Sequence, residues 1–181
     1  MDLFRNIRLR VGNTILRKRV ARTSRKMEYR NFIDVRSICV VWNASKHEDF
    51  NTLARFHQKM QERNIEIKII GYYGGKHLPD QYTAIRYLTF IRKSETNLFY
   101  IPESSEIQEF TNRKFDILID INFEKIFPLL YITKLSKASL KVGIFEPEAD
   151  TPFDIMMEIK NPVQLDEYLK QVIQYLEMIK N

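Results

Sequence analysis

The sequence predicts a three-layer, Rossmann-like α/β fold with a mostly parallel sheet, helices on both faces and a basic N-terminal helical extension. Two observations indicate this class. Short apolar runs rich in β-branched residues alternate with longer segments whose apolar residues repeat at helical spacing. The runs are continuous, which is typical of strands that are covered on both faces. A chain of 181 residues is long enough for one such domain with its own core.

We expect the extension to cover residues 1–33 and the domain to cover residues 34–181. Residues 1–30 contain ten Lys or Arg and two acids, a net charge of +8, whereas the rest has 19 Lys or Arg and 21 acids. An anionic partner should therefore bind the extension. Its apolar residues fall on one helical face, which a glycine-asparagine pair weakens midway. That face consists of Leu3, Phe4, Ile7, Val11 and Ile15.

The extension has several open interpretations. It can be a basic helix that packs partly on its own domain, or a contact for an unidentified protein partner. It can also lie on an anionic membrane surface. The basic candidates for membrane or anion contact are Arg17, Lys18, Arg19, Arg22, Arg25 and Lys26. Nucleic acid has the least support, because no aromatic residues are interleaved for base stacking. The segment also has the Arg-rich character of a transit peptide.

The first half of the domain should contain two strands and two helices around an ambiguous segment. Residues 37–42 (SICVVW) and 65–73 (IEIKIIGYY) are the strands. A helix from about residue 49 to residue 63 joins them, with an apolar stripe at Phe50, Leu53, Ala54, His57 and Met60. Within residues 81–101, YLTFI and NLFYI are short strands, or YLTFI ends a helix that begins at Gln81. Ser104 or Ser105 then caps a short helix.

The second half should contain three strands and two further helices. The strands are residues 115–122 (FDILIDIN), 140–145 (LKVGIF) and 153–159 (FDIMMEI). Pro128 fits the first turn of a helix that runs to about residue 137. Asn161 caps the last helix, with Pro162 at its first position and Gln164 completing a capping box. The apolar face of that helix is Leu165, Leu169, Val172, Ile173, Leu176 and Ile179.

Asp116 and Asp120 lie on one strand but cannot form a catalytic pair. Four residues of extended chain separate them by about 13 Å, whereas paired carboxylates of glycosidases lie roughly 5–9.5 Å apart. Asp116 sits at the entering end of the strand, where it should cap backbone groups or meet solvent. Asp120 sits at the exit end, where it contacts a ligand or bonds the amides of the following loop.

Ligands of parallel α/β sheets bind beyond the carboxyl ends of the strands. The polar and glycine residues that follow the predicted strands are therefore the candidates for ligand binding: Asn43, Ser45, Lys46, His47, Gly74, Gly75, Lys76, His77, Asp120, Asn122 and Glu146. A small anionic ligand should contact Ser45, Lys46 or the turn at 74–76, where backbone amides and lysines are available. The GYYGGKH segment departs from the Walker pattern in its glycine spacing and in lacking Ser or Thr after the lysine, which favours a flexible turn.

Histidine and cysteine positions give no metal or nucleophile motif. His57 lies in a helical apolar stripe, where a packed histidine is expected. His47 and His77 lie in loops at the same edge and remain open as an acid/base or metal pair. No H-x-x-x-H, H-E-x-x-H or G-x-S-x-G pattern occurs. Cys39 lies inside an apolar strand, where we expect a buried, reduced thiol. We therefore predict no metal, no cofactor and no catalytic residue.

The composition also limits the location of the protein. No apolar run approaches the roughly 18–20 residues of a membrane-spanning helix, and the N-terminus lacks the apolar core of a secretory signal. A single cysteine cannot form an internal disulfide. We expect a cytoplasmic protein that can be peripheral to the membrane through its extension.

The stretch FDILIDINFEKIFPLLYITKLSKASLKVGIF resembles the N-terminal Rossmann-like half of heptosyltransferase-type glycosyltransferases. It resembles more closely a bacterial family of single-domain proteins of unknown function. These resemblances imply the fold and no catalytic residue. We predict a binding or interaction module without evident catalytic machinery; the alternative is a nucleotide- or nucleotide-sugar-binding half-domain that works with a partner subunit. A deep cleft lined by Ser45, Lys46, His77 and Asp120 would favour the alternative.

Overall fold

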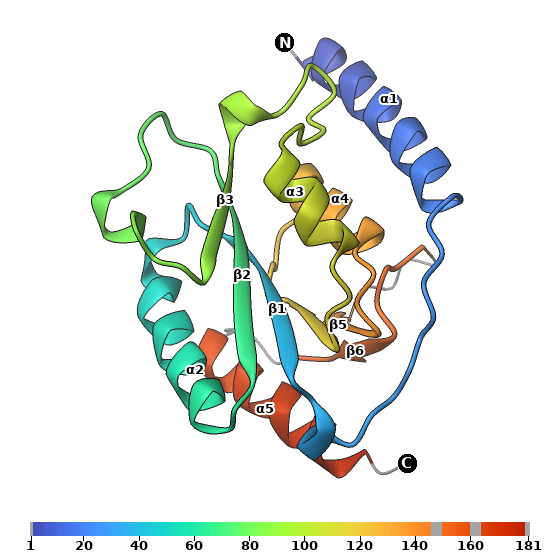
Figure 1. The fold of residues 1–181 in the computed structure, drawn as a ribbon. Coiled ribbons are helices and arrows are strands. Elements are labelled where there is room, and N and C mark those ends of the chain that lie inside the picture. The colour runs from blue at the N-terminus through green and yellow to red at the C-terminus, as the bar shows by residue number, and fades with distance from the viewer. Residues whose placement is uncertain (1, 146–149, 160–163, 180–181) are drawn as a thin grey trace.

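The structure is a computed structural model, and it describes residues 2–145, 150–159 and 164–179. Its strands form one six-stranded sheet in the order β3-β2-β1-β4-β5-β6, and every pairing is parallel. The strands are β1 (Ser37–Asn43), β2 (Glu66–Tyr73), β3 (Leu88–Arg92), β4 (Ile117–Asp120), β5 (Leu140–Ile144) and β6 (Ile155–Met157). The predicted three-layer α/β fold is confirmed (Figure 1).

Helices cover both faces of this sheet (Figure 1). They are α1 (Asp2–Val20), α2 (Phe50–Glu62), α3 (Ser105–Asn112), α4 (Phe127–Leu135) and α5 (Leu165–Met178). Helices α2 and α5 pack on one face, whereas α1, α3 and α4 pack on the other. After α1 the chain descends in extended form from the carboxyl ends of the strands to their amino ends, where β1 begins (Figure 1).

Alternate side chains of β1 enter two separate cores, one on each side of the sheet. Ile38, Val40 and Trp42 join the core beneath α2 and α5. Cys39 and Val41 join the core beneath α1, α3 and α4. All five side chains are at most 1% exposed, so the strand is covered on both faces as the continuous apolar run predicts. The predicted burial of Cys39 is confirmed, and burial raises the pKa of its thiol.

The helical stripes read from the sequence miss two buried aromatic residues. Phe56 of α2 and Tyr168 of α5 are 6% and 0% exposed, yet neither belongs to the predicted stripe of its helix. The predicted cap of α3 is present, since Ser104 Oγ accepts a hydrogen bond from the amide of Ile107 at 3.3 Å. Helix α5 begins after Gln164, and its predicted Asn161 cap and Pro162 lie outside the described residues.

The ambiguous segment at 81–101 contains one strand and one turn. YLTFI supplies β3, which pairs with β2, and no helix begins at Gln81, because residues 80–82 form a single 3-10 turn. NLFYI is a turn rather than a strand, and an isolated bridge between Thr96 and Pro102 closes it. The periodicity of apolar residues could not tell strand from helix or turn for YLTFI and NLFYI, because both runs are short.

Helix α1 packs on the domain mainly with a different face from the predicted apolar stripe, of which Ile15 alone packs against the core. Leu16 is 1% exposed and joins the core beside α4. Gly12 is buried against the 96–102 turn, where a Cβ atom would lie 2.5 Å from the carbonyl oxygen of Phe99. The helix continues through Gly12, and the missing side chain permits this approach. Most of the predicted stripe is exposed instead: Leu3 70%, Phe4 77%, Ile7 49% and Val11 37%.

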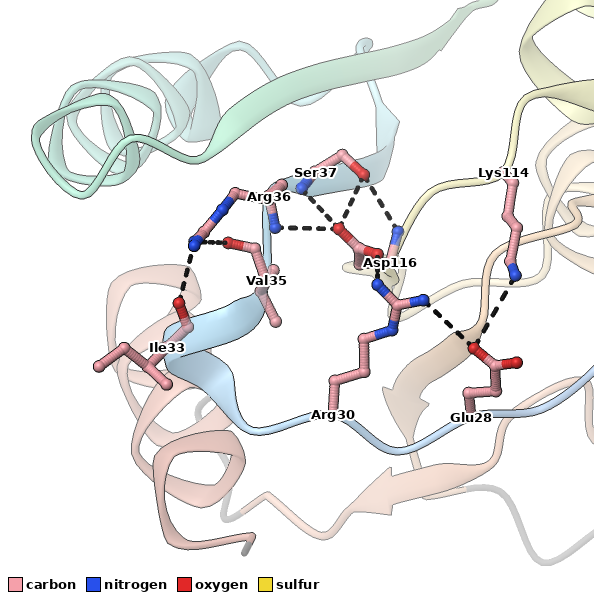
Figure 2. Close-up of polar contacts among 8 residues, drawn as sticks. All are labelled: Glu28, Arg30, Ile33, Val35, Arg36, Ser37, Lys114 and Asp116. Carbon is pink, nitrogen blue, oxygen red and sulfur yellow. Dashed lines mark hydrogen bonds and ion pairs between the residues drawn. The ribbon is translucent and has the colours of Figure 1, made fainter. Parts of the chain in front are cut away.

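The carboxylate of Asp116 closes the amino edge of the sheet (Figure 2). Its Oδ2 accepts hydrogen bonds from the backbone amides of Arg36 and Ser37, both at 2.9 Å. Its Oδ1 accepts from Arg30 Nη1 at 3.1 Å. Hydrogen bonds from a neighbouring lysine and from Arg30 lower the pKa of Glu28 beside it. Asp116 therefore joins the segment before β1 to β4, which is a capping role and not a catalytic one.

Candidate functional site

From β1 the chain adds strands first toward one edge of the sheet (β2, β3) and then toward the other (β4, β5, β6). The switch point between β1 and β4 brings predicted ligand residues together. Asn43 ends β1 and Asp120 ends β4. Asn122 follows β4 and donates from Nδ2 to the backbone carbonyl of Val41 at 3.1 Å. The carboxyl ends of the two central strands are therefore joined directly by a side chain.

Asp120 is 7% exposed and holds the loop after β4. Its Oδ1 accepts from the backbone amide of Asn122 at 3.0 Å and from the side-chain amide at 2.6 Å. Its Oδ2 accepts from the Thr133 hydroxyl of α4 at 2.7 Å. The Tyr168 hydroxyl donates to the Asp120 carbonyl at 3.1 Å, and burial raises the pKa of this tyrosine. These bonds correspond to the loop-anchoring role, one of the two predicted for Asp120.

Side chains fill the space between the exits of β1 and β4. Lys46 Nζ lies 3.4 Å from Glu124 Oε1 and 5.9 Å from the ring centroid of Phe123. The hollow between them has no room for a water-sized body among the described residues. Trp42 Nε1 and Asn122 Oδ1 are buried without a hydrogen-bond partner in the described part of the chain. The Lys46 side of the switch point is thus closed, whereas Asp120, Asn122 and Glu124 line a cavity on the α1 side.

The candidate residues after β2 form a second group. The amide of Gly74 donates to Ser45 Oγ at 3.4 Å. His47 Nδ1 lies 2.7 Å from the hydroxyl of Tyr82, and the two rings stack. The remaining residues of this turn, Gly75, Lys76 and His77, are exposed. The predicted ligand residue Glu146 lies outside the described residues.

Two further features concern metal binding and membrane crossing. Within the described ranges, no group of three His, Cys, Asp or Glu side chains could hold a metal ion. No helix in the same ranges is both long and apolar enough to cross a membrane. His57 stacks on Tyr87 with ring centroids 3.8 Å apart, and burial lowers its pKa, so it packs as the sequence predicts.

The predicted basic contacts of the extension are partly engaged by the domain. Arg25 donates to both carboxylate oxygens of Asp154, at 2.7 and 2.5 Å. Arg19 donates to the Tyr131 hydroxyl. Lys26 pairs with a neighbouring glutamate at 3.0 Å. Arg19 and Lys26 are exposed despite these contacts, and Arg25 is partly buried. Arg17, Lys18 and Arg22 are also exposed, on or just after the second half of α1. These three are the predicted contacts that an anionic partner can reach most directly.

A short turn adds an exposed apolar side chain beside α1. Asn97 Oδ1 accepts from the amides of Phe99 and Ile101, at 2.8 and 3.2 Å, which holds the turn closed. Leu98 within this turn is 70% exposed, and Arg8 of α1 donates to its carbonyl oxygen. We use the name α1 patch for these exposed apolar residues together: Leu3, Phe4, Ile7, Val11 and Leu98.

A cavity of about 760 Å³ lies between α1, the exit of β4 and α4. Polar and basic residues of α1 line one side, namely Arg10, Asn13, Thr14 and Arg17. Phe127, Leu130 and Lys134 of α4 line another, and the segment at Asp150–Phe153 contributes to its rim. Asp120 and Asn122 also line it, so the cavity adjoins part of the predicted ligand set. The sequence signal that could have located it is the spacing of Arg10 and Arg17, which share a helical face.

The parallel sheet order, with its switch point between β1 and β4, defines a Rossmann-like α/β protein. Residues 8–179 match the family described as Family of unknown function (DUF6913), and the chain belongs to this family. The match begins at Arg8 within α1 and extends past α5, so it includes the later part of α1 and all six strands. No curated protein matches the chain. The match agrees with the predicted resemblance to a family of unknown function and does not bear on the heptosyltransferase-type resemblance.

Proposed function

We propose that this protein is a binding module, without catalytic machinery of its own, that attaches to anionic membrane surfaces through α1. One observation carries the proposal. Helix α1 already packs on the domain through Leu16 and Gly12, while Leu3 and Phe4 remain 70% and 77% exposed on its other side. Packing within the chain therefore does not explain these apolar residues. A helix with an apolar face and a strongly basic composition is typical of attachment at a membrane interface.

Charge favours a membrane over the other possible occupants of the α1 patch. Residues 1–30 carry a net charge of +8, and Arg17, Lys18 and Arg22 are exposed on or just after the second half of the same helix. A second copy of this chain would bring two such segments together, and their repulsion opposes self-association. Nucleic acid would use the cations but leave the apolar residues in water. Anionic lipids complement both features at once.

The expected strength is that of a reversible attachment. Burying an exposed Leu, Ile or Phe contributes about 1–2 kcal/mol when burial is partial, and each basic residue near an anionic surface contributes about 1 kcal/mol. Three apolar side chains and three cations together contribute on the order of 6 kcal/mol, equivalent to a roughly 10⁴-fold preference for the membrane. Attachment of this strength responds strongly to salt.

The alternative of a nucleotide- or nucleotide-sugar-binding half-domain has less support. This alternative requires a deep cleft lined by Ser45, Lys46, His77 and Asp120. The space between Lys46 and Glu124 is filled, and the cavity at the exit of β4 is lined by Asp120 but lies away from the other three residues. The Asp120 carboxylate bonds the loop and α4 from within the chain. These observations favour the binding module.

Sedimentation with lipid vesicles tests the proposal. The full chain is mixed with vesicles that contain phosphatidylglycerol and with vesicles of phosphatidylcholine alone. We expect binding to the anionic vesicles at low salt and weaker binding as salt rises, because salt screens charge. Replacing Leu3, Phe4 and Ile7 together by serine should weaken binding about 100-fold or more, since loss of each apolar contact is worth up to about tenfold.

A matched control replaces exposed apolar residues away from α1. Ile33 and Met178 are 81% and 76% exposed, and Ile33 lies at the amino edge of the sheet near Asp116 (Figure 2). The double change Ile33→Ser and Met178→Ser should leave vesicle binding intact. The proposal fails if the full chain does not bind anionic vesicles at low salt, or if the triple serine variant binds as well as the unchanged protein.

A further inference from the structure

We infer that the cavity between α1 and α4 binds the phosphate headgroup of an individual anionic phospholipid, with the lipid's apolar part against the neighbouring apolar side chains. This inference rests on the proposed function, because it names the lipid chemistry that α1 meets at the membrane. The site is the 760 Å³ cavity that Arg10 and Arg17 line from α1. Its volume lies in the range of small-molecule sites, about 300–1,000 Å³.

The helical positions connect this cavity with the α1 patch. Leu3, Arg10 and Arg17 are spaced seven residues apart, close to two helical turns, so they form one line along α1. Leu3 at the start of the line is exposed, and the two arginines line the cavity. When the α1 patch lies on a membrane, the arginine line and the cavity behind it are therefore at headgroup level.

The charges around the cavity favour an anion. Each acid that lines it already has a partner inside the chain. Asp120 accepts from Thr133 at 2.7 Å and from Asn122, Glu124 pairs with Lys46, and Asp150 pairs with Lys134 at 2.7 Å. The hydrogen bond from Lys134 is the main cause that lowers the pKa of Asp150, so this rim pair is charged at neutral pH. Thr133 and Asn122 are neutral, so the charge of Asp120 remains, and the charge of Arg17 also helps to lower the pKa of Asp150. The lining nevertheless has four basic residues, Arg10, Arg17, Lys125 and Lys134, against three acids, so its net charge is positive.

Arginine suits this ligand because its planar guanidinium donates two parallel hydrogen bonds to phosphate oxygens. Two arginines on one helix face, about 10 Å apart, can contact a headgroup together with the first atoms of its glycerol. The lining also contains apolar side chains: Leu9 of α1, Phe127 and Leu130 of α4, and Phe153. These side chains offer contact to glycerol and acyl carbons but none to a free phosphate ion.

The experiment uses a lipid that stays monomeric, so that no membrane is present. Dihexanoyl phosphatidylglycerol, below its micelle-forming concentration, is titrated into the full chain in a calorimeter. Dihexanoyl phosphatidylcholine and inorganic phosphate are titrated in parallel. We expect dihexanoyl phosphatidylglycerol to bind most tightly and dihexanoyl phosphatidylcholine to bind at least tenfold more weakly. Inorganic phosphate should bind weakest. Equal affinity for inorganic phosphate would overturn the lipid assignment.

Two double variants locate the binding. The double variant Arg10→Gln with Arg17→Gln should weaken binding of dihexanoyl phosphatidylglycerol at least tenfold. The control, Arg55→Gln with Lys59→Gln on α2, removes the same charge on the opposite face of the sheet and should leave binding unchanged. Equal weakening in both variants would assign the effect to net charge and overturn the assignment of the cavity as the lipid-binding site. Melting temperatures of both variants establish that the comparison is between folded proteins.

The serine variant of the α1 patch separates this inference from the proposed function. It should lose vesicle binding yet retain binding of the monomeric lipid. If the full chain binds anionic vesicles but not the monomeric lipid, the cavity assignment is overturned and the proposed function stands. If it binds the monomeric lipid through Arg10 and Arg17 but binds no vesicles, the cavity is supported and membrane attachment fails.

Discussion

Substituting the same residue type on the two faces of α1 tests whether only one face is structural. Leu16 is 1% exposed within the core beside α4, and Leu3 is 70% exposed on the same helix. Leu16→Ala removes buried carbon atoms and leaves a cavity, which costs about 2–4 kcal/mol. Leu3→Ala removes atoms that are already in water, so it should change the free energy of unfolding by less than about 0.5 kcal/mol.

Chemical denaturation with urea measures both values, and thermal melting gives a second readout. For a chain of this size each kcal/mol shifts the melting temperature by roughly 2–4 °C, so Leu16→Ala should melt about 4–16 °C lower. Leu3→Ala should melt unchanged. Equal, small effects of the two substitutions would show that α1 does not pack through Leu16, and the assignment of inner and outer faces would be refuted.

Three further predictions follow from single contacts. Asp116→Asn places an amide against backbone donors and loses the pairing with an arginine, so it should cost about 1–3 kcal/mol in urea denaturation; an unchanged midpoint would contradict its capping role. Gly12→Ala places a methyl group 2.5 Å from a carbonyl oxygen and should cost about 1–3 kcal/mol, whereas Asn13→Ala, its exposed neighbour, should not. Burial, and then the charge of Arg25, lowers the pKa of Lys141 from 10.5 to about 8. Between these values the unfolded chain binds more protons than the folded protein, so stability rises with pH across that window. Lys141→Met should flatten this rise in melting temperature, and an identical slope would show that Lys141 is not the cause.

The strands were predictable from the sequence because they are covered on both faces. SICVVW is an almost continuous apolar run and FDILIDIN has the apolar centre ILI between its two aspartates, and β1 and β4 are buried along nearly their whole length. The burial of Cys39 follows from the same pattern. The buried ring of Tyr168 did not follow, because its hydroxyl partner is the Asp120 carbonyl on a distant strand. A pattern along one segment contains no information about such a partner.

The face of α1 that packs was not predictable for a related reason. The helix has one apolar line through Leu3 and Ile7 and a second through Leu9 and Leu16, and periodicity favours the longer line. Packing is decided by tertiary contacts, chiefly the close approach of Gly12 to a backbone carbonyl. Of the predicted ligand residues, the structure brings Asn43, Lys46 and Asn122 together, with Asp120 bonded to Asn122. It leaves Lys76 and His77 exposed elsewhere. The strand-exit rule locates an edge of the sheet, but loop conformation decides which residues meet there.

The most direct test of the central claim is the depth of α1 in a membrane. Cys39, the single cysteine, is fully buried, so a nitroxide label attaches selectively to the thiol introduced by Ile7→Cys. The control label is attached through Ile33→Cys, at the amino edge of the sheet. With excess anionic vesicles at low salt, the label at position 7 should lie about 5–10 Å below the headgroup boundary. Its relaxation by oxygen should then rise, while the label at position 33 remains in water. A label at position 7 that stays as accessible to a water-soluble relaxation agent as the label at position 33 would contradict membrane attachment through α1.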